Sequence, residues 1–403
     1  MIKDLEKKIL AYALKNALEY DGKAKEGSVL NSLFHEGLEK KDVKKMIPKI
    51  KEEIKKVNKM SLDEQKKEFS IFEKEISHRK VREGLEDLPG AKKNKVIMRF
   101  APSPSGPLHI GHAATACISF LYVQKYGGKF YVRIEDTNPE NIYKSAYKMI
   151  EEDSKWLFNN KAKIIIQSKR MSLYYKYAEK LLKLEKAYVC TCASEKFKES
   201  IEKKENCPCR ALSVKENLER WEKMLSKSKR GYKEGEAVLR FKSDMQDKNP
   251  AFRDFPLARI NDTPHPLQGK KYRVWPLMNL AVSVDDIEQG MTHIIRAKEH
   301  RDNAKRQAMI FKALGKKSPW TGFLGRWHFK DLHLSTTQMR KDIESGKYKS
   351  WEDERLPTLI SLRKQGYKPE AFWKFSEQVG LSEVDKTVSK EEYFNLLRSF
   401  NKK

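Results

Sequence analysis

The most constraining feature of this chain is the 14-residue stretch Arg99-Phe-Ala-Pro-Ser-Pro-Ser-Gly-Pro-Leu-His-Ile-Gly-His112, which holds three prolines, two glycines and two histidines. An apolar run precedes it at 96–98 and another follows it at 113–123. This pattern is typical of a strand, a tight loop and a helix. Loops at such junctions are where α/β proteins bind phosphate groups. The stretch therefore predicts an α/β domain with a nucleotide-binding loop.

The two histidines of this loop have a spacing that suits phosphate chemistry. His109 and His112 are three residues apart, so they share one face of the predicted helix start. Imidazoles placed there can donate hydrogen bonds to phosphate oxygens as negative charge shifts among them. Gly111 lets the backbone approach a nucleotide closely. A proline-rich loop with incidental histidines is the competing interpretation, and the length of the whole string argues against it.

The string also resembles a known family. His109-Ile-Gly-His112 resembles the HIGH signature of class I aminoacyl-tRNA synthetases, and the residues before it resemble the glutamyl branch. The glutaminyl branch usually shows Pro-Glu-Pro-Asn in the middle of this string, which is absent here. Arg133–Pro139 and Asp285–Arg296 are similar to two later family blocks and occur in the family order. The long N-terminal extension resembles the archaeal and eukaryotic form, so the whole chain, 1–403, resembles an archaeal-type glutamyl-tRNA synthetase.

The resemblance and the alternation of elements predict an α/β fold with a Rossmann-like parallel sheet. Strands are expected at 96–100, 129–134 and 163–166, and helices around 113–126 and 141–158, because crossover helices make such strands parallel. Another amphipathic helix is expected at 168–184, and the parallel sheet is expected to resume at Val274 and to continue through 293–295.

The predicted fold has six parts. Helical periodicity in the first 82 residues predicts an N-terminal helical domain, and Ser61-Leu-Asp-Glu64 resembles a capping box within it. The expected divisions are the helical domain at 1–82, a linker at 83–95, the first Rossmann half with the HIGH loop at 96–189, an inserted acceptor-binding domain at 190–269, the second Rossmann half at 270–330, and a KMSKS-like loop with a helical stem-contact region at 331–403.

By resemblance, the reaction is ATP-dependent ligation of L-glutamate to the 3′ end of tRNA(Glu) through glutamyl-adenylate, with Mg²⁺ assisting at the phosphates. The protein then has to position the reactants and stabilise charge, rather than form bonds itself. The resemblance places ATP at Pro102, Gly106, His109, Gly111, His112, Glu299 and Ser335.

The glutamate site implied by the resemblance needs cations for two carboxylates and an anion for the ammonium group. Arg99 and Arg296 suit bidentate binding of carboxylate, and Arg99 is expected to read the side-chain carboxylate. The other implied residues are Ala101, Ser103 and Glu135, the last at the ammonium. For each charged residue taken singly, the competing interpretation is a surface ion pair worth ~0–1 kcal/mol.

Two positions depart from the family pattern. Met278 stands where the family usually has a substrate-facing tyrosine, which removes one hydrogen bond. His333–Lys341 occupies the place of the KMSKS loop, and Gln338 stands at a family lysine. Losing that ammonium could cost on the order of 10²-fold in rate, by comparison with other preorganised donors. Arg340 and Lys341 are the candidate catalytic cations that could replace it.

Five cysteines in 403 residues do not suggest a disulfide framework, but four of them are paired in sequence. Cys190-X-Cys192 and Cys207-X-Cys209 are separated by 14 residues, and four thiolates suit a structural Zn²⁺. One-residue spacing is less usual than two to four, so free thiols remain the alternative. Cys117, in the helix after the HIGH loop, is expected to be a core residue.

The net charge of +27 favours a polyanionic partner, which the resemblance identifies as the acceptor end of tRNA. A lysine-biased proteome is an alternative source of that charge. No apolar run approaches 18 residues and the N-terminus lacks a signal-peptide core, so we expect a cytoplasmic protein without a membrane partner. We also expect a monomer.

Three questions stay open at the level of sequence. The chain stops at Lys403, before the β-barrel anticodon domains of full-length archaeal-type relatives. It is therefore a catalytic fragment, one half of a split enzyme with a separate anticodon-binding chain, or a reduced enzyme, and whether tRNA(Gln) is also charged is undecided. The alternatives to a ligase are a glutamate-activating paralogue that modifies a tRNA base, and a tRNA-binding protein with impaired catalysis.

Overall fold

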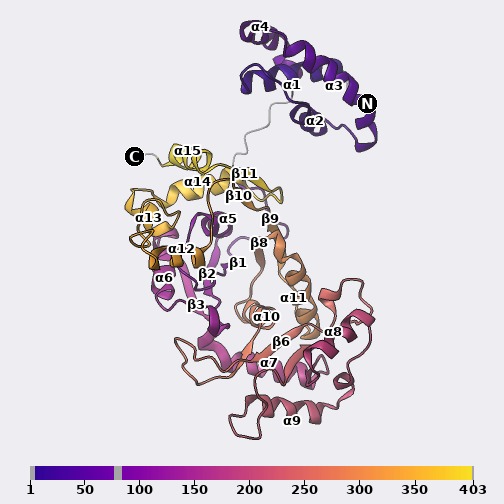
Figure 1. Cartoon of the computed structure of the whole chain (residues 1–403), viewed down its shortest axis with the longest axis vertical. Helices are drawn as coiled ribbons and strands as arrows, with labels where there is room; N and C mark the ends of the chain where they lie inside the picture. Colours follow the sequence, from indigo (N-terminus) through magenta and orange to yellow (C-terminus); the bar gives the residue numbers. More distant parts are fainter. Residues whose placement is uncertain (1–4, 77–83, 402–403) are drawn as a thin grey trace. The chain divides into compact units, whose positions relative to one another are not determined.

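The computed structural model describes residues 5–76 and 84–401, and the chain divides into two compact units, Met1–Arg82 and Glu83–Lys403 (Figure 1). The first unit is helical, as the periodicity predicts. Its helices are α1 (Leu5–Glu19), α2 (Glu26–His35), α3 (Val43–Val57) and α4 (Leu62–Phe72). The predicted capping box is confirmed, because Ser61 Oγ accepts from Glu64 N while Ser61 N donates to Glu64 Oε2 at 2.8 Å. The core of the unit contains Ile9, Leu14, Val29 and Ile50, all fully buried.

The second unit is built around parallel strands, which confirms the predicted fold class. Strands β1 (Val96–Phe100), β2 (Gly128–Ile134) and β3 (Ala162–Ile166) pair in parallel in that order, and β8 (His293–Ala297) pairs in parallel with β9 (Trp320–Leu324). Thr292 joins the two sets, since its N–H donates to Ile97 O at 3.0 Å. The helices between these strands are α5 (Ile110–Tyr126), α6 (Ala146–Leu157), α7 (Met171–Lys183), α10 (Met278–Glu288) and α11 (Arg301–Ala313).

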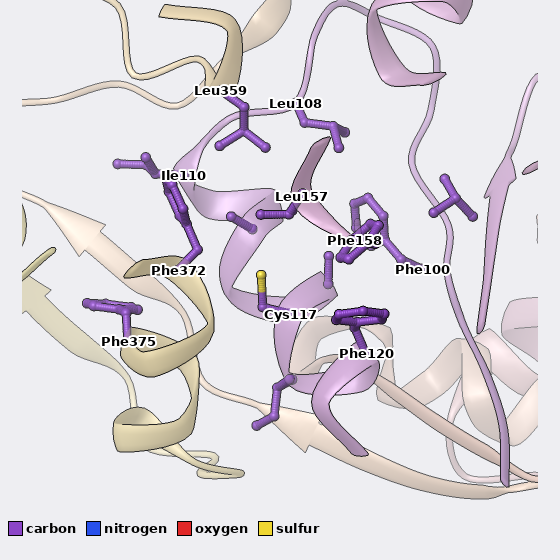
Figure 2. Packing of buried hydrophobic residues seen from close by; sticks show 14 of the residues in the cluster. Phe100, Leu108, Ile110, Cys117, Phe120, Leu157, Phe158, Leu359, Phe372 and Phe375 are labelled. Carbon is purple, nitrogen blue, oxygen red and sulfur yellow. The ribbon is translucent and has the colours of Figure 1, made fainter. Parts of the chain in front are cut away.

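The main core of this unit surrounds α5. Cys117 is fully buried there, as expected of a core residue, and Figure 2 shows its sulfur pointing among apolar side chains. Phe372 and Phe375 reach the same core from α14 (Pro369–Val379), which packs against α5 (Figure 2). The loop that precedes α5 is thereby fixed on a well-packed helix.

A second, antiparallel sheet interrupts the parallel one. It contains β4 (Ala187–Cys190), β5 (Val238–Phe241), β6 (Pro256–Ile260) and β7 (Val274–Pro276), flanked by α8 (Ser194–Lys203) and α9 (Val214–Leu225). The expectation that Val274 resumes the parallel sheet is wrong, because β7 pairs antiparallel with β6. A short buried apolar run does not disclose its partner strand, and the parallel pairing resumes only at β8.

The C-terminal part of the chain is mostly helical, as predicted from about residue 300 onward. Its helices after α11 are α12 (Thr336–Glu344), α13 (Leu359–Lys364), α14 and α15 (Lys390–Phe400). The sequence did not predict the short parallel pair β10 (Trp327–Phe329) and β11 (Lys386–Val388). Within residues 5–76 and 84–401, no helix has the length and apolar character needed to cross a bilayer.

Candidate active site

A cleft of about 600 Å³ opens where β1, β2 and β8 end, which is the usual ligand position of parallel α/β sheets. Most of the predicted site residues line it. They are Arg99, Ala101, Pro102, Ser103, His109, Gly111, His112, Glu135, Arg296 and Glu299. Gly106, Ser335, Arg340 and Lys341 are not among the cleft residues. The structure therefore brings ten of the predicted residues together in one cleft and leaves these four outside its lining.

The histidine pair is neutral and oriented. His109 Nδ1 accepts from Gly111 N at 3.1 Å, and His112 Nδ1 accepts from His109 N at 3.3 Å. Since both Nδ1 atoms accept, each ring carries its proton on Nε2. Burial lowers the pKa of His109 well below its usual value and that of His112 to about 4. At neutral pH the loop therefore offers two N–H donors with no net charge.

The glycine of the HIGH loop is required by close packing. A Cβ on Gly111 would lie 3.0 Å from Cε1 of His109 and 3.0 Å from Cδ1 of Leu334. The rings of His109 and His112 stack with their centroids 3.7 Å apart, so the His109 ring has little room to move away from a new side chain. A side chain at position 111 would disturb the histidine that caps α5.

A buried charge cluster holds the cleft residues Arg99 and Glu135 in place. Asp286 on α10 accepts from Arg99 Nε at 3.0 Å and Nη2 at 3.3 Å, and from Arg133 Nη1 at 2.6 Å. Burial alone would raise the pKa of Asp286, but Arg99 and Arg133 outweigh it and lower the pKa to about 2. Arg133 also pairs with Glu135 at 3.2 Å. The two arginines are thus held by internal carboxylates.

Arg296 differs from the other arginines of the cluster. Its side chain is 8 % exposed and donates Nη1 to Gln307 Oε1 at 2.9 Å, while Nε has no hydrogen-bond partner. No carboxylate pairs with it within 4 Å in the described part of the chain. Burial, followed by the charge of Arg99, lowers its pKa to about 10, so it stays protonated at pH 7. The carboxylates of Asp286 and Glu135 favour its charged form from farther away, without outweighing burial and Arg99. A buried cation without a directly bonded carboxylate is an arrangement that an anionic ligand would stabilise.

Other predicted cleft residues have defined neighbours. Glu299 pairs with Arg326, which lowers the pKa of its carboxyl. Met278, the departure from the expected tyrosine, begins α10 and lines the cleft with 43 % of its surface exposed. It therefore presents a thioether to a ligand where a phenol would present a hydroxyl.

The KMSKS-like segment lies against the HIGH loop, and it contributes Leu334 to the lining of the cleft. Thr336 Oγ1 is 2.7 Å from Ser105 Oγ, and a Cβ on Gly106 would lie 3.2 Å from Thr336 Cβ. Ser335 caps α12 by accepting from Gln338 N at 3.3 Å. The exposed side chain of Gln338 donates to Asp342 at 2.8 Å, away from the cleft residues.

The two candidate cations of this segment differ in environment. Arg340 is half-buried, with its guanidinium 5.4 Å above the Tyr143 ring, and its Nε makes no hydrogen bond. The same Nε lies 3.7 Å from Glu344 Oε1, within ion-pair distance. Lys341 is exposed. Only Arg340 therefore combines positive charge with a fixed position.

The four predicted zinc ligands converge. Sγ of Cys207 lies 3.6 Å from that of Cys190 and 3.4 Å from that of Cys192, and Cys192 lies 3.8 Å from Cys209. All four sulfurs are within 4.8 Å of one another, and none is in a disulfide. A Zn–S bond of about 2.3 Å in a tetrahedron implies sulfur–sulfur distances of about 3.8 Å. The donor set and its spacing therefore fit Zn²⁺.

Sequence reasoning did not assign roles to Asp286 and Arg133. Both lie within the quoted family blocks, and a detectable signal was present. Arg133 interrupts an apolar strand, and Asp286 follows the mainly apolar segment 280–284 on α10 after one other aspartate. A charged residue at a position whose neighbours are all buried requires a charged partner, although its identity depends on the fold.

Comparisons with known proteins agree with this geometry. The family model described as tRNA synthetases class I (E and Q), catalytic domain, matches residues 95–402. The chain is 44% identical over 391 residues to a glutamate–tRNA ligase of Methanocaldococcus jannaschii, covering 97% of this chain and 70% of that protein. It is 44% identical to a glutamate–tRNA ligase of Pyrococcus abyssi, covering 96% and 69%.

A solved structure supports the fold. The crystal structure of a glutamate-tRNA synthetase from Elizabethkingia anophelis matches with a TM-score of 0.50 at 22% identity, covering 75% of this chain and 70% of that one. The family itself is shown by the matching family model and by the two sequence matches. The chain belongs to the glutamate–tRNA ligases of the class I aminoacyl-tRNA synthetases.

Proposed function

We propose that this chain activates L-glutamate with ATP and transfers the glutamyl group from glutamyl-adenylate to the 3′ end of tRNA(Glu). The observation that carries the proposal is the unpaired, buried Arg296 in the same cleft as two neutral imidazole donors. An amino acid with two carboxylates supplies the missing negative charge, and the imidazoles suit the triphosphate.

Glutamate is proposed to bind on the side of the cleft formed by β1 and β8. Arg296 offers the counter-charge for one carboxylate, and Arg99 offers the guanidinium nitrogen that Asp286 leaves unused for the other. Glu135, held by Arg133, is suited to the ammonium group. Ala101 and Ser103 complete the proposed set from the loop after β1.

ATP is proposed to bind against the HIGH loop, with the Nε2–H groups of His109 and His112 donating to its phosphates. Neutral donors stabilise the charge that moves onto the leaving pyrophosphate without requiring a proton transfer. Pro102, Gly111 and Glu299 are the other proposed contacts in the cleft, and Gly106 and Ser335 support the loop from outside it. Mg²⁺, when bound, neutralises phosphate charge, a role that suits the family reaction.

Arg340 is proposed to supply the positive charge that Gln338 lacks, with exposed Lys341 as a secondary contributor. The Arg340→Ala variant is expected to lower the rate of ATP–pyrophosphate exchange by about tenfold, because it removes a positioned cation near the phosphates. Lys364→Ala, which removes a surface partner of Glu352, is the control and should leave the rate unchanged. An unchanged rate in Arg340→Ala would show that the missing ammonium is not replaced there.

The cysteine cluster is proposed to hold one structural Zn²⁺. Arg220 Nη1 donates to Cys209 Sγ at 3.3 Å, which offsets part of the negative charge of four thiolates around a dication. Purified protein should contain about one equivalent of zinc, and Cys207→Ser should lose it and destabilise the fold around β4. Cys117→Ser, buried in a different core, is the matched control and should keep the metal. Less than about half an equivalent in the unaltered protein would contradict the site.

The remaining assignments follow from the same proposal. The inserted domain, predicted at 190–269 and spanned by strands from Ala187 to Pro276, is proposed to bind the tRNA acceptor end. A single copy is sufficient, because the predicted cleft residues all come from one unit. The cytoplasm is the proposed location.

One specific observation favours a second function. Gln338 and Met278 both replace groups expected to aid catalysis, which is the arrangement of a tRNA-binding protein with impaired chemistry. Acylation of tRNA(Glu) with radiolabelled glutamate tests the ligase directly. Periodate-oxidised tRNA, which lacks an intact terminal ribose, should not be acylated. Acylation of the oxidised tRNA would indicate base modification, and binding without acylation of either tRNA would indicate the impaired protein.

A further inference from the structure

Asp153 is a buried carboxylate that the reaction as described does not use. It lies on α6, and its residue is 0 % exposed. Its Oδ2 accepts from Leu108 N at 2.9 Å, while Oδ1 is buried without a hydrogen-bond partner. No cation lies within 4 Å of it in the described ranges. A carboxylate in such surroundings is costly, and a leucine or an amide would be cheaper to bury.

Asp153 holds the backbone N–H of Leu108, the residue immediately before His109. The carbonyl of Leu108 accepts from Leu359 N at 2.8 Å, and Ile110 N donates to Pro357 O at 3.1 Å. Residues 108–110 are therefore fixed from two sides, by α6 through one carboxylate oxygen and by the chain entering α13. Figure 2 shows Leu108 and Leu359 close together above the α5 core.

The position of the His109 ring depends on this attachment. His109 has an extended backbone as the N-cap of α5, and its ring is held by its contact with Gly111 N and by stacking on His112. A shift of the backbone at Leu108 moves the Nε2–H donor relative to the cleft. A displacement of this kind lowers the rate of the reaction, because preorganised donors stabilise the transition state only at the correct distance.

We propose that Asp153 is a positioning residue of glutamate activation, whose ionised carboxylate holds the Leu108 N–H and so sets the place from which His109 donates to the phosphates. The inference rests on the proposed activation reaction. This role explains why the protein buries a carboxylate where an apolar residue would cost less free energy to bury. A charged acceptor makes a shorter and stronger hydrogen bond than a neutral one.

Asp153 also gives the loop a sensitivity to pH. Burial raises its pKa to about 7, against the opposing effect of the Leu108 N–H. The charged groups that act on it are Arg363 on α13, which favours the ionised form, and Glu152 on α6, which disfavours it. The histidines of the loop have lower pKa values, so we expect protonation of Asp153 to lower the activity between pH 8 and 6. Protonation in that range weakens the hydrogen bond that fixes the loop.

Three variants separate this role from a structural one. Asp153→Asn keeps an accepting oxygen but cannot ionise, Asp153→Leu removes the acceptor, and Glu151→Gln changes an exposed carboxylate on the same helix as a control. Glutamate-dependent ATP–pyrophosphate exchange is measured from pH 5.5 to 8.5. In Asp153→Leu, kcat should fall about 10- to 100-fold at pH 8, as for loss of a hydrogen bond to a charged group. The KM for glutamate should stay within about twofold, because the glutamate contacts are unchanged.

The pH profile decides the proposal. The unaltered protein and Glu151→Gln should show an acid limb with a midpoint near pH 7, which Asp153→Asn should lack. Asp153→Asn should also be more stable than the unaltered protein at pH 8, since a carboxyl with a raised pKa costs stability once it ionises. Identical profiles in Asp153→Asn and the unaltered protein would overturn the proposal, and this holds even if Asp153→Leu fails to fold.

A second readout does not depend on activity. In protein labelled with ¹⁵N-histidine, the ring signals of His109 should shift with a midpoint near pH 7 in the unaltered protein and not in Asp153→Asn. His109 itself does not titrate there, so the shift reports Asp153. If the protein shows no exchange activity but this shift is present, the activation reaction is wrong and the coupling of Asp153 to His109 stands. If the shift is absent, the coupling is wrong.

Discussion

The Arg296→Gln variant is expected to raise the KM for glutamate on the order of 10²-fold in ATP–pyrophosphate exchange, equivalent to about 3 kcal/mol of lost binding. Arg296 is a buried guanidinium of the cleft with no carboxylate within 4 Å among the described residues, so we expect substrate to provide its direct counter-charge. Glutamine can reach Gln307 and donate a hydrogen bond, but it carries no charge. Arg296→Lys keeps the positive charge but lacks the planar guanidinium. Its KM for glutamate should lie between those of the unaltered protein and Arg296→Gln.

Protein stability distinguishes this effect from simple damage. Removing an unpaired buried cation relieves its repulsion with Arg99, so the urea midpoint of Arg296→Gln should equal or exceed that of the unaltered protein. Lys364→Gln, which breaks an exposed pair with Glu352, is the control and should change neither property. A KM for glutamate within threefold of normal would contradict the assignment of Arg296.

The second large effect is expected on stability. Asp286→Asn should lower the free energy of unfolding of the 83–403 unit by about 3–5 kcal/mol, because it leaves Arg99 and Arg133 buried without their shared counter-charge. Asp286 has a pKa lowered to about 2, so its contribution is fully present above about pH 4 and is lost only as the pH falls toward 2. The loss in the variant should therefore be constant from pH 5 to 8.

Tryptophan fluorescence in urea measures this change cleanly, since all seven tryptophans lie in the 83–403 unit. Asp262→Asn is the matched control, because Asp262 is half exposed and pairs with Arg273 at 3.0 Å. The free energy of unfolding of Asp262→Asn should stay within about 1 kcal/mol of that of the unaltered protein. A difference of less than 1 kcal/mol between Asp286→Asn and the unaltered protein would show that the cluster does not hold Arg99 and Glu135 in place.

The features of this molecule that depend on one short segment could be predicted from the sequence. The HIGH loop was predictable because its prolines, glycines and histidines restrict the backbone within 14 residues. The cysteine cluster was predictable because thiolate ligands are close in sequence and few other arrangements use them. In both cases the information lies within one short segment.

The parts that depend on distant segments could not be read in this way. Asp286 meets Arg99 across 187 residues and Arg133 across 153, and no periodicity marks such a pairing. Strand β7 looked like a continuation of the parallel sheet because its apolar residues suit either sheet. Gly106 within the HIGH loop and Ser335 at the start of α12 both lie outside the cleft lining, a distinction that only packing decides.

Glutamate-dependent ATP–pyrophosphate exchange, compared with exchange in the presence of L-glutamine at the same concentration, tests whether this cleft activates glutamate and distinguishes it by charge. We expect exchange with glutamate and a rate at least about 10²-fold lower with glutamine, which cannot balance the charge of Arg296 and Arg99. Folded protein that shows no exchange with glutamate, or equal exchange with both amino acids, would contradict this role of the cleft.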